Sequence, residues 1–114
     1  MDELSFVAGS HRDFDKFPAA VQEVMLHGLT MARTGRKHVL AKPLKGFPGA
    51  KEMEIPYPHH GDAYRLIYTT RFDGVVYVLH AFKKKSVKGI STPKQEIDLV
   101  RARLKLVSEN RRDR

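Results

Sequence analysis

Three consecutive lysines close a hydrophobic run in the stretch VLHAFKKKSVKG, residues 78–89, and a fourth lysine follows before the glycine. Neighbouring ammonium charges disfavour one another, so one lysine of such a run could exchange a proton near neutral pH. Successive side chains on an extended backbone point to opposite faces. At least one of these lysines is therefore expected on the face that carries His80, or turned toward the strand that carries Arg65.

Arg65 lies among apolar and aromatic residues in the stretch YRLIY, where an unpartnered charge is costly to bury. It could pair with a carboxylate such as Asp62 or Glu54. Alternatively it could bind an anion, because the planar guanidinium can meet two phosphate oxygens at once. The residues alone leave both interpretations open.

His80 has Val78 and Phe82 two residues away on either side, which predicts that all three share one face of a strand. A histidine in this setting is most often a packed or hydrogen-bonded core residue, but it could also act as a general acid or base. Together with Arg65 and a lysine it would suffice for RNA cleavage without metal. In that reaction the 2′-hydroxyl attacks the adjacent phosphorus, and cations stabilise the charge that develops.

Other chemistries lack their motifs. The sequence has no cysteine, no Gly-rich phosphate loop and no His-Glu-x-x-His pair, so disulfides, nucleotide hydrolysis and zinc chemistry have no support. His59 and His60 adjoin in a proline-bounded turn, where a metal would need further ligands, and exposed loop histidines are the better interpretation. We therefore expect no cofactor and no metal.

The charge distribution points to a phosphate-bearing partner. The net charge is +8, and no acidic residue occurs between Glu23 and Glu52 or between Asp73 and Glu96, although both stretches carry several lysines. Surfaces that bind nucleic acid typically lack acidic residues in this way. A pair of solvated, lysine-rich loops would show the same charge pattern. The candidate catalytic residues are Arg65, Lys84, His80 and Lys85. The candidate RNA-binding residues are Lys42, Lys45, Lys83, Lys88 and Arg71.

Local patterns predict the elements that position these residues. Strands are expected at residues 4–8, 52–55, 64–71 and 75–82, the second ended by Pro56 and Pro58, and the last two joined by an Asp-Gly hairpin turn. A helical hairpin or kinked helix is expected from Ser10 to about Gly35. After a loop at 36–50 and the central strands, a closing helix is expected, with Thr92 as its cap, Pro93 at its first position and a frayed tail at 109–114.

These elements predict an α+β fold, a small antiparallel sheet with an N-terminal helical hairpin and a C-terminal helix, the helices covering one side. The length fits one domain spanning residues 1–114, since domains typically run from about 50 to 250 residues. The acidic start differs from a secretory signal, and no apolar run approaches the roughly 18 residues of a membrane span. We therefore expect a cytoplasmic protein.

Two stretches, KPLKGFPGAKEMEI (42–55) and GDAYRLIYTTRFDGVVYVLHAFKKKSVKGISTPKQEIDLVRARLK (61–105), resemble the phage-derived, HigB-like branch of the RelE/ParE toxin superfamily. The resemblance implies the toxin of a type II toxin–antitoxin pair, an mRNA interferase that cleaves messages on the translating ribosome and is neutralised by a helix-turn-helix antitoxin. It implies that Arg65 contacts the scissile phosphate. It also implies that Lys84, or a neighbouring lysine, is the basic residue that follows the last strand.

The sequence departs from the RelE pattern at two places. Glu52 and Glu54 stand on the strand where RelE-like enzymes carry basic residues, and no tyrosine follows Tyr77. The catalytic set must then differ, be reduced or be absent. Two alternatives follow: a ParE-like inhibitor of DNA gyrase that cuts nothing, or a phage protein that only binds nucleic acid through its basic loops.

Overall fold

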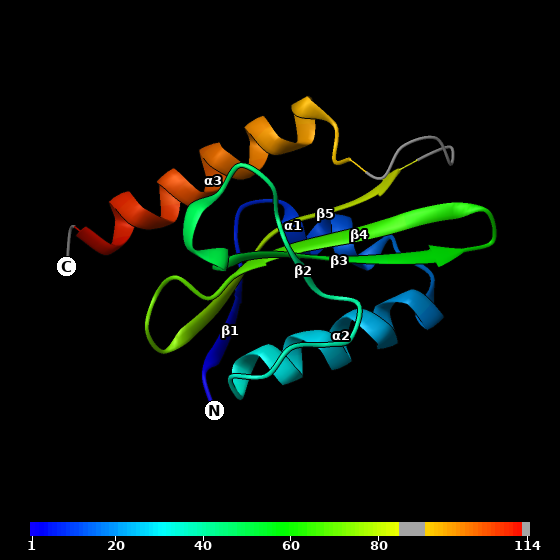
Figure 1. Cartoon of the computed structure of the whole chain (residues 1–114), viewed down its shortest axis with the longest axis horizontal. Coiled ribbons are helices and arrows are strands. Elements are labelled where there is room, and N and C mark those ends of the chain that lie inside the picture. Colours follow the sequence, from blue (N-terminus) through cyan, green and yellow to red (C-terminus); the bar gives the residue numbers. More distant parts are fainter. Residues whose placement is uncertain (85–90, 113–114) are drawn as a thin grey trace.

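The protein is represented by a computed structural model that describes residues 1–84 and 91–112 (Figure 1). Its elements in chain order are β1 (Glu3–Phe6), α1 (Ser10–Asp15), α2 (Ala19–Arg33), β2 (Lys42–Pro43), the 3₁₀ turn η1 (Pro48–Ala50), β3 (Glu52–His59), β4 (Asp62–Thr69), β5 (Val75–Lys84) and α3 (Lys94–Arg112).

The five strands form one sheet in the order β1-β5-β4-β3-β2. β1 runs parallel to β5, and the other neighbours are antiparallel. The predicted α+β fold with an N-terminal helical hairpin and a C-terminal helix is confirmed, but the sheet is mixed. The parallel pair arises because two helices and three strands separate β1 from β5, which leaves ample chain for a crossover.

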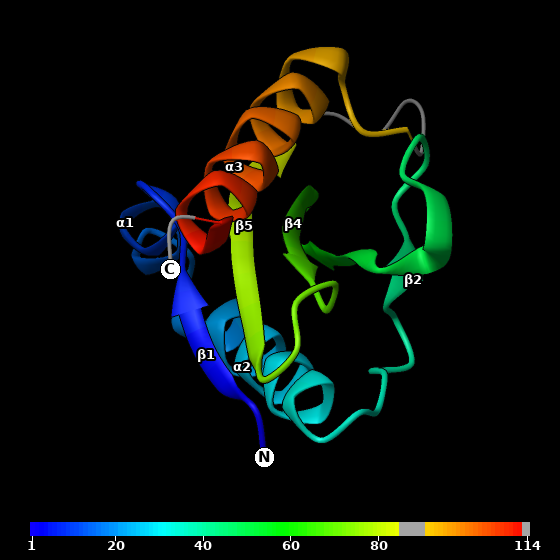
Figure 2. The same cartoon turned by 90° about the vertical axis from the view of Figure 1, so that its left-hand side faces the viewer.

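Helices cover both faces of the sheet, which corrects the prediction that they cover one side (Figure 2). On one face, Val21, Met25 and Leu29 of α2 are buried against strand residues such as Leu66. On the other face, Val100 and Val107 of α3 pack with Ile67 and Leu79. Successive residues of β4 therefore pack into two different hydrophobic cores, one on each face of the sheet, and each face is covered by a helix.

A β-bulge in β5 changes which residues share a face. Ile67 of β4 pairs with His80 and Tyr68 pairs with Val78, so Leu79 is an extra residue in β5. Such an insertion reverses the alternation beyond it. His80 consequently shares a face with Phe82, whose ring it stacks against at 4.9 Å, but Val78 lies in the core under α2. The prediction that all three share one face was wrong.

β3 continues through both prolines to His59, although the sequence predicted that Pro56 and Pro58 would end it. β2 pairs with β3 only at Met53 and Glu54. The backbone groups of Pro56 and Pro58 point to the same side as those of Glu54, toward the edge where β2 pairs. β2 does not extend as far as the prolines, so no strand in the described part of the chain needs the N–H group that each proline lacks. An edge of this kind tolerates proline.

The C-terminal helix reaches Arg112, so the tail predicted from residue 109 onward is wrong for residues 109–112. Arg111 Nη1 donates a hydrogen bond of 2.9 Å to the Tyr77 hydroxyl, which fastens this end to β5. None of the helices in the described ranges combines the length and apolar character needed to cross a bilayer.

Candidate active site

Polar side chains gather on the sheet face that α3 covers. Strand pairing sets Glu54 beside Ile67 and Arg65 beside Phe82, and the bulge brings His80 to the same face. The three polar residues Glu54, Arg65 and His80 are each at most 5% exposed. Buried ionisable groups need partners, so the pairing among them determines what this face can do.

Arg65 forms a buried ion pair with Glu54. Its Nη1 donates to both carboxylate oxygens of Glu54 at 3.1 Å. Of the two carboxylates proposed from the sequence, Glu54 is the partner, whereas Asp62 lies 3.7 Å from the ammonium of Lys83. Of the two interpretations of Arg65, the structure therefore shows the one in which it pairs with a carboxylate. Its guanidinium lies beneath the surface.

Thr92 joins this ion pair from the segment before α3. Its hydroxyl donates to Glu54 Oε2 and lies 3.3 Å from Arg65 Nη1. The sequence predicted Thr92 as a helix cap with Pro93 at the first helical position, but α3 begins at Lys94. The Thr92 hydroxyl thus ties the start of the C-terminal helix to the centre of the sheet.

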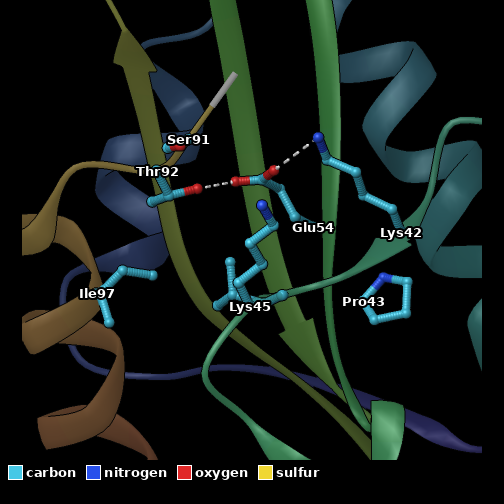
Figure 3. Close-up of a pocket in the computed structure, with 8 residues that line it drawn as sticks. Lys42, Pro43, Lys45, Glu54, Ser91, Thr92 and Ile97 are labelled. Carbon is cyan, nitrogen blue, oxygen red and sulfur yellow. Dashed lines mark hydrogen bonds and ion pairs between the residues drawn. The ribbon is translucent and has the colours of Figure 1, made fainter. Parts of the chain in front are cut away.

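A pocket of about 140 Å³ opens above this cluster (Figure 3). Its rim and floor include Lys42, Lys45, Glu54 and Thr92, and Pro43, Leu44, Ser91 and Ile97 complete the walls. Figure 3 shows the Glu54 carboxylate lying between Thr92 and Lys42, whose Nζ is 3.7 Å from Glu54 Oε1. Beside the pocket, Lys84 Nζ donates to the Ser91 carbonyl at 2.7 Å. Lys42 and Lys45 therefore line the pocket together with a buried carboxylate, and Lys84 contacts the wall of the pocket at Ser91.

A second buried carboxylate, Glu52, holds Arg71. The Arg71 guanidinium donates to Glu52 at 2.6 and 2.8 Å and to the Pro48 carbonyl at 2.8 Å, and Thr69 donates to Glu52 at 2.7 Å. Burial by itself would raise the pKa of Glu52, but the bonds from Arg71 and Thr69 and the Arg71 charge together lower it. The bond to Glu52 in turn raises the pKa of Arg71. Arg71 thus fastens η1 to the sheet, and its proposed contact with RNA stays a prediction.

His80 has a partner at each ring nitrogen. Its Nε2 lies 3.1 Å from Glu96 Oε1, and its Nδ1 lies 3.4 Å from Arg103 Nη1, which also donates to the Leu79 carbonyl at 2.9 Å. Arginine can only donate, so Nδ1 accepts and Nε2 is left to donate to Glu96. This geometry favours the role of a packed, hydrogen-bonded histidine over that of a general acid or base.

The remaining candidate lysines do not line the pocket or lie outside the described residues. Lys83 pairs across the strands with Tyr64 and faces away from the pocket. Lys85 and Lys88 lie outside the described residues. Among the residues that the structure describes, no group of three or more His, Cys, Asp or Glu side chains could hold a metal ion.

Glu54 and Thr92 are pocket residues that sequence reasoning did not assign to the site. Glu54 was noted as a pairing partner and as a departure from a basic position, and Thr92 as a cap. One signal was available, because a glutamate inside an apolar strand needs a cation nearby. The contact between residues 54 and 92 has no such signal, since 38 positions separate them.

The comparisons with known proteins agree with this architecture. The family described as "Phage derived protein Gp49-like" matches residues 12–105. Among solved structures, the chain is similar to that titled "Crystal structure of the isolated E. coli RelE toxin, P21 form". The TM-score is 0.60 at 22% sequence identity, and the match covers 77% of this chain and 89% of that chain, so this likeness is one of fold. No curated protein matches the sequence.

Proposed function

The chain belongs to the Gp49-like phage-derived family, a family of RelE/HigB-type toxins, and from this premise we propose that it is a toxin that cleaves translated messenger RNA on the ribosome. The observation that carries the proposal is the cationic pocket on a RelE-like fold. Lys42 and Lys45 line it, and Lys84 contacts its wall at Ser91. A pocket with such a rim suits a phosphodiester between two nucleotides.

The reaction that this pocket supports is an internal phosphoryl transfer. The 2′-oxygen of one nucleotide bonds to the adjacent phosphorus, and the bond from phosphorus to the 5′-oxygen of the next nucleotide breaks. The products are a 2′,3′-cyclic phosphate and a free 5′-hydroxyl. Lys42 and Lys45 stabilise the charge that grows on the phosphate oxygens, a contribution that reaches about 10²- to 10³-fold for a single well-placed donor.

Two proton transfers complete the reaction. Glu54 is the carboxylate among the described residues that line the pocket, and we assign it the proton of the 2′-hydroxyl. Lys84, whose ammonium carries three donors, supplies the proton to the departing 5′-oxygen. Protein cations thus take the place that a metal would hold in this chemistry.

Arg65 acts through Glu54 in this proposal. Arg65 is 5% exposed and does not line the pocket, whereas its partners Glu54 and Thr92 do. A phosphate would have to displace Glu54 to reach it. We therefore assign Arg65 the role of positioning the carboxylate, while direct phosphate contact by Arg65 stays a prediction from the family resemblance.

The test is a translation reaction on a defined mRNA, with and without ribosomes, followed by mapping of new 5′ ends by primer extension. We expect new ends only with ribosomes, and their loss with Lys42→Ala or Lys84→Ala. Lys16→Ala is the matched control, because this exposed lysine is the C-cap of α1 and does not line the pocket. Intact mRNA in the presence of folded protein would overturn the proposal, and a gyrase cleavage assay would then test the ParE-like alternative.

We also propose a helix-turn-helix antitoxin as the neutralising partner, since toxins of this type are held inactive by one. Growth arrest upon expression of the chain should be relieved by coexpression of such a protein encoded beside it. Relief by the neighbour without formation of a complex would argue against direct neutralisation.

A further inference from the structure

A second hollow, of about 480 Å³, runs along α3 beyond the pocket. It lies between the helix and two loops, one carrying Phe47 and the other Phe72. On the helix side it is lined by Arg101, Leu104 and Lys105. The mechanism above uses none of these residues.

Aromatic and guanidinium planes line this groove. The Arg101 guanidinium lies over the Phe47 ring with its central carbon 4.4 Å from the ring centroid. Phe72 is half-buried and lines the groove with a second ring, and the Arg111 guanidinium lies 5.3 Å from the centroid of this ring. Unpaired bases stack on both kinds of surface, since every base presents a flat π-face.

The groove also carries positive charge that the protein does not neutralise. Arg71 is paired with Glu52. Across the described residues, neither Arg101 nor Lys105 has a carboxylate within ion-pair distance. Both side chains are exposed, and Glu109 is the single acidic residue among those that line the groove. The surface therefore complements an anionic chain.

The groove continues the pocket. Ile97 lines the pocket and Arg101, one helical turn later, lines the groove, while the loop from Lys45 to Phe47 passes from one to the other. Arg101 Nη2 donates to the Gly46 carbonyl at 3.2 Å, which joins the helix to this loop. The eight-residue step from Ile97 to Lys105 spans about 12 Å of helix, or about three stacked nucleotides.

We propose that this groove binds the single-stranded RNA adjoining the nucleotide held in the pocket. Bases stack on Arg101 and Phe72, and Lys105 contacts the phosphates. The choice of RNA rests on the proposed function. An acidic peptide would satisfy the charge but would make no use of the stacking planes, so the observations favour RNA.

The test is fluorescence anisotropy of a labelled short oligouridylate with the full-length protein in a series of salt concentrations, without ribosomes. The main variant is Arg101→Ala/Lys105→Ala. We expect affinity to fall by about tenfold or more, because stacking and phosphate contacts are lost together. The slope of log K against log salt should decrease by about 0.7, since Lys105 is the phosphate contact that is lost and each single-strand phosphate contact contributes about 0.7.

Two further variants separate stacking from charge. Arg36→Ala/Lys37→Ala removes the same charge from exposed residues after α2, which covers the other sheet face, and should change affinity by less than about twofold. Arg101→Lys keeps the charge and loses the plane, so it should still weaken binding. Circular dichroism and the unfolding midpoint verify that each variant is folded.

The binding assay tests the groove separately from the proposed nuclease activity, because it uses no ribosomes and measures no cleavage. Equal losses for the groove variant and the Arg36/Lys37 control would refute the groove as a site. A polyglutamate peptide that competes as well as oligouridylate, with Arg101→Lys unchanged, would assign the groove to acidic peptides and overturn the proposal. RNA binding that depends on Arg101 in a protein that cuts no mRNA would support the groove and refute the nuclease.

Discussion

Breaking the buried pair between Glu54 and Arg65 should destabilise the protein far more than breaking an exposed pair. Both side chains are at most 6% exposed, and Arg65 Nη1 bonds both carboxylate oxygens at 3.1 Å. Removal of one partner from such a pair leaves an uncompensated buried charge and costs about 3–5 kcal/mol. A protein of this size has a total stability of about 5–15 kcal/mol, so single variants should fold with a small margin.

The measurement is a double-mutant cycle with Glu54→Gln, Arg65→Met and the double variant, each unfolded in urea. With an m-value of about 2 kcal/mol/M, a loss of about 3 kcal/mol lowers the midpoint by about 1.5 M. The double variant should be more stable than the sum of the single effects predicts, with a coupling energy of about 1–3 kcal/mol.

Lys94 and Asp98 provide a matched control on the protein surface. Their Nζ and Oδ2 atoms are 2.8 Å apart, but the side chains are 86% and 57% exposed. Solvent screens such a pair, so the same cycle with Lys94→Met and Asp98→Asn should give a coupling energy of at most about 0.5 kcal/mol. A buried pair that couples no more strongly than this control would refute the reasoning from burial.

Three further predictions concern Glu52, Tyr68 and Gly28. Because the pKa of Glu52 is lowered in the folded state, its contribution to stability is present above its ordinary pKa of 4.5 and is lost as pH falls through the folded value. Chemical denaturation across an acidic pH series should show this loss, and Glu52→Gln should show a flatter profile. Burial raises the pKa of Tyr68 to about 12, so one phenol should ionise late in an alkaline absorbance titration, and Tyr68→Phe should remove that late step. A Cβ on Gly28 would lie 2.5 Å from Ile55 Cδ1, so Gly28→Ala should destabilise by about 1–3 kcal/mol despite the better helix propensity of alanine. Ile55→Val removes the clashing methyl and should restore part of the loss, and additive effects of the two substitutions would contradict this account.

The sequence by itself determined the family and the order of the longer elements, whereas β2 and η1 lie in the stretch 36–50 that was predicted to be a loop. The two central strands were recognised by their β-branched and aromatic residues, and they occupy Asp62–Thr69 and Val75–Lys84 within a few residues of the predicted bounds. The turn between them follows from Asp-Gly, and Gly74 has the positive φ of 83° that such a turn favours. These features depend on neighbours in the chain, so local patterns suffice to predict them.

The tertiary structure alone decided the composition of the candidate site. One inserted residue, Leu79, reversed the alternation of β5 and thereby separated His80 from Val78. Strand register selected Glu54 as the partner of Arg65, and the placement of α3 brought Thr92 to both. The physical reason is that these contacts join positions far apart in the chain, where register, bulges and helix docking act together. A local pattern specifies which residues need partners, whereas the packed fold specifies which partners they find.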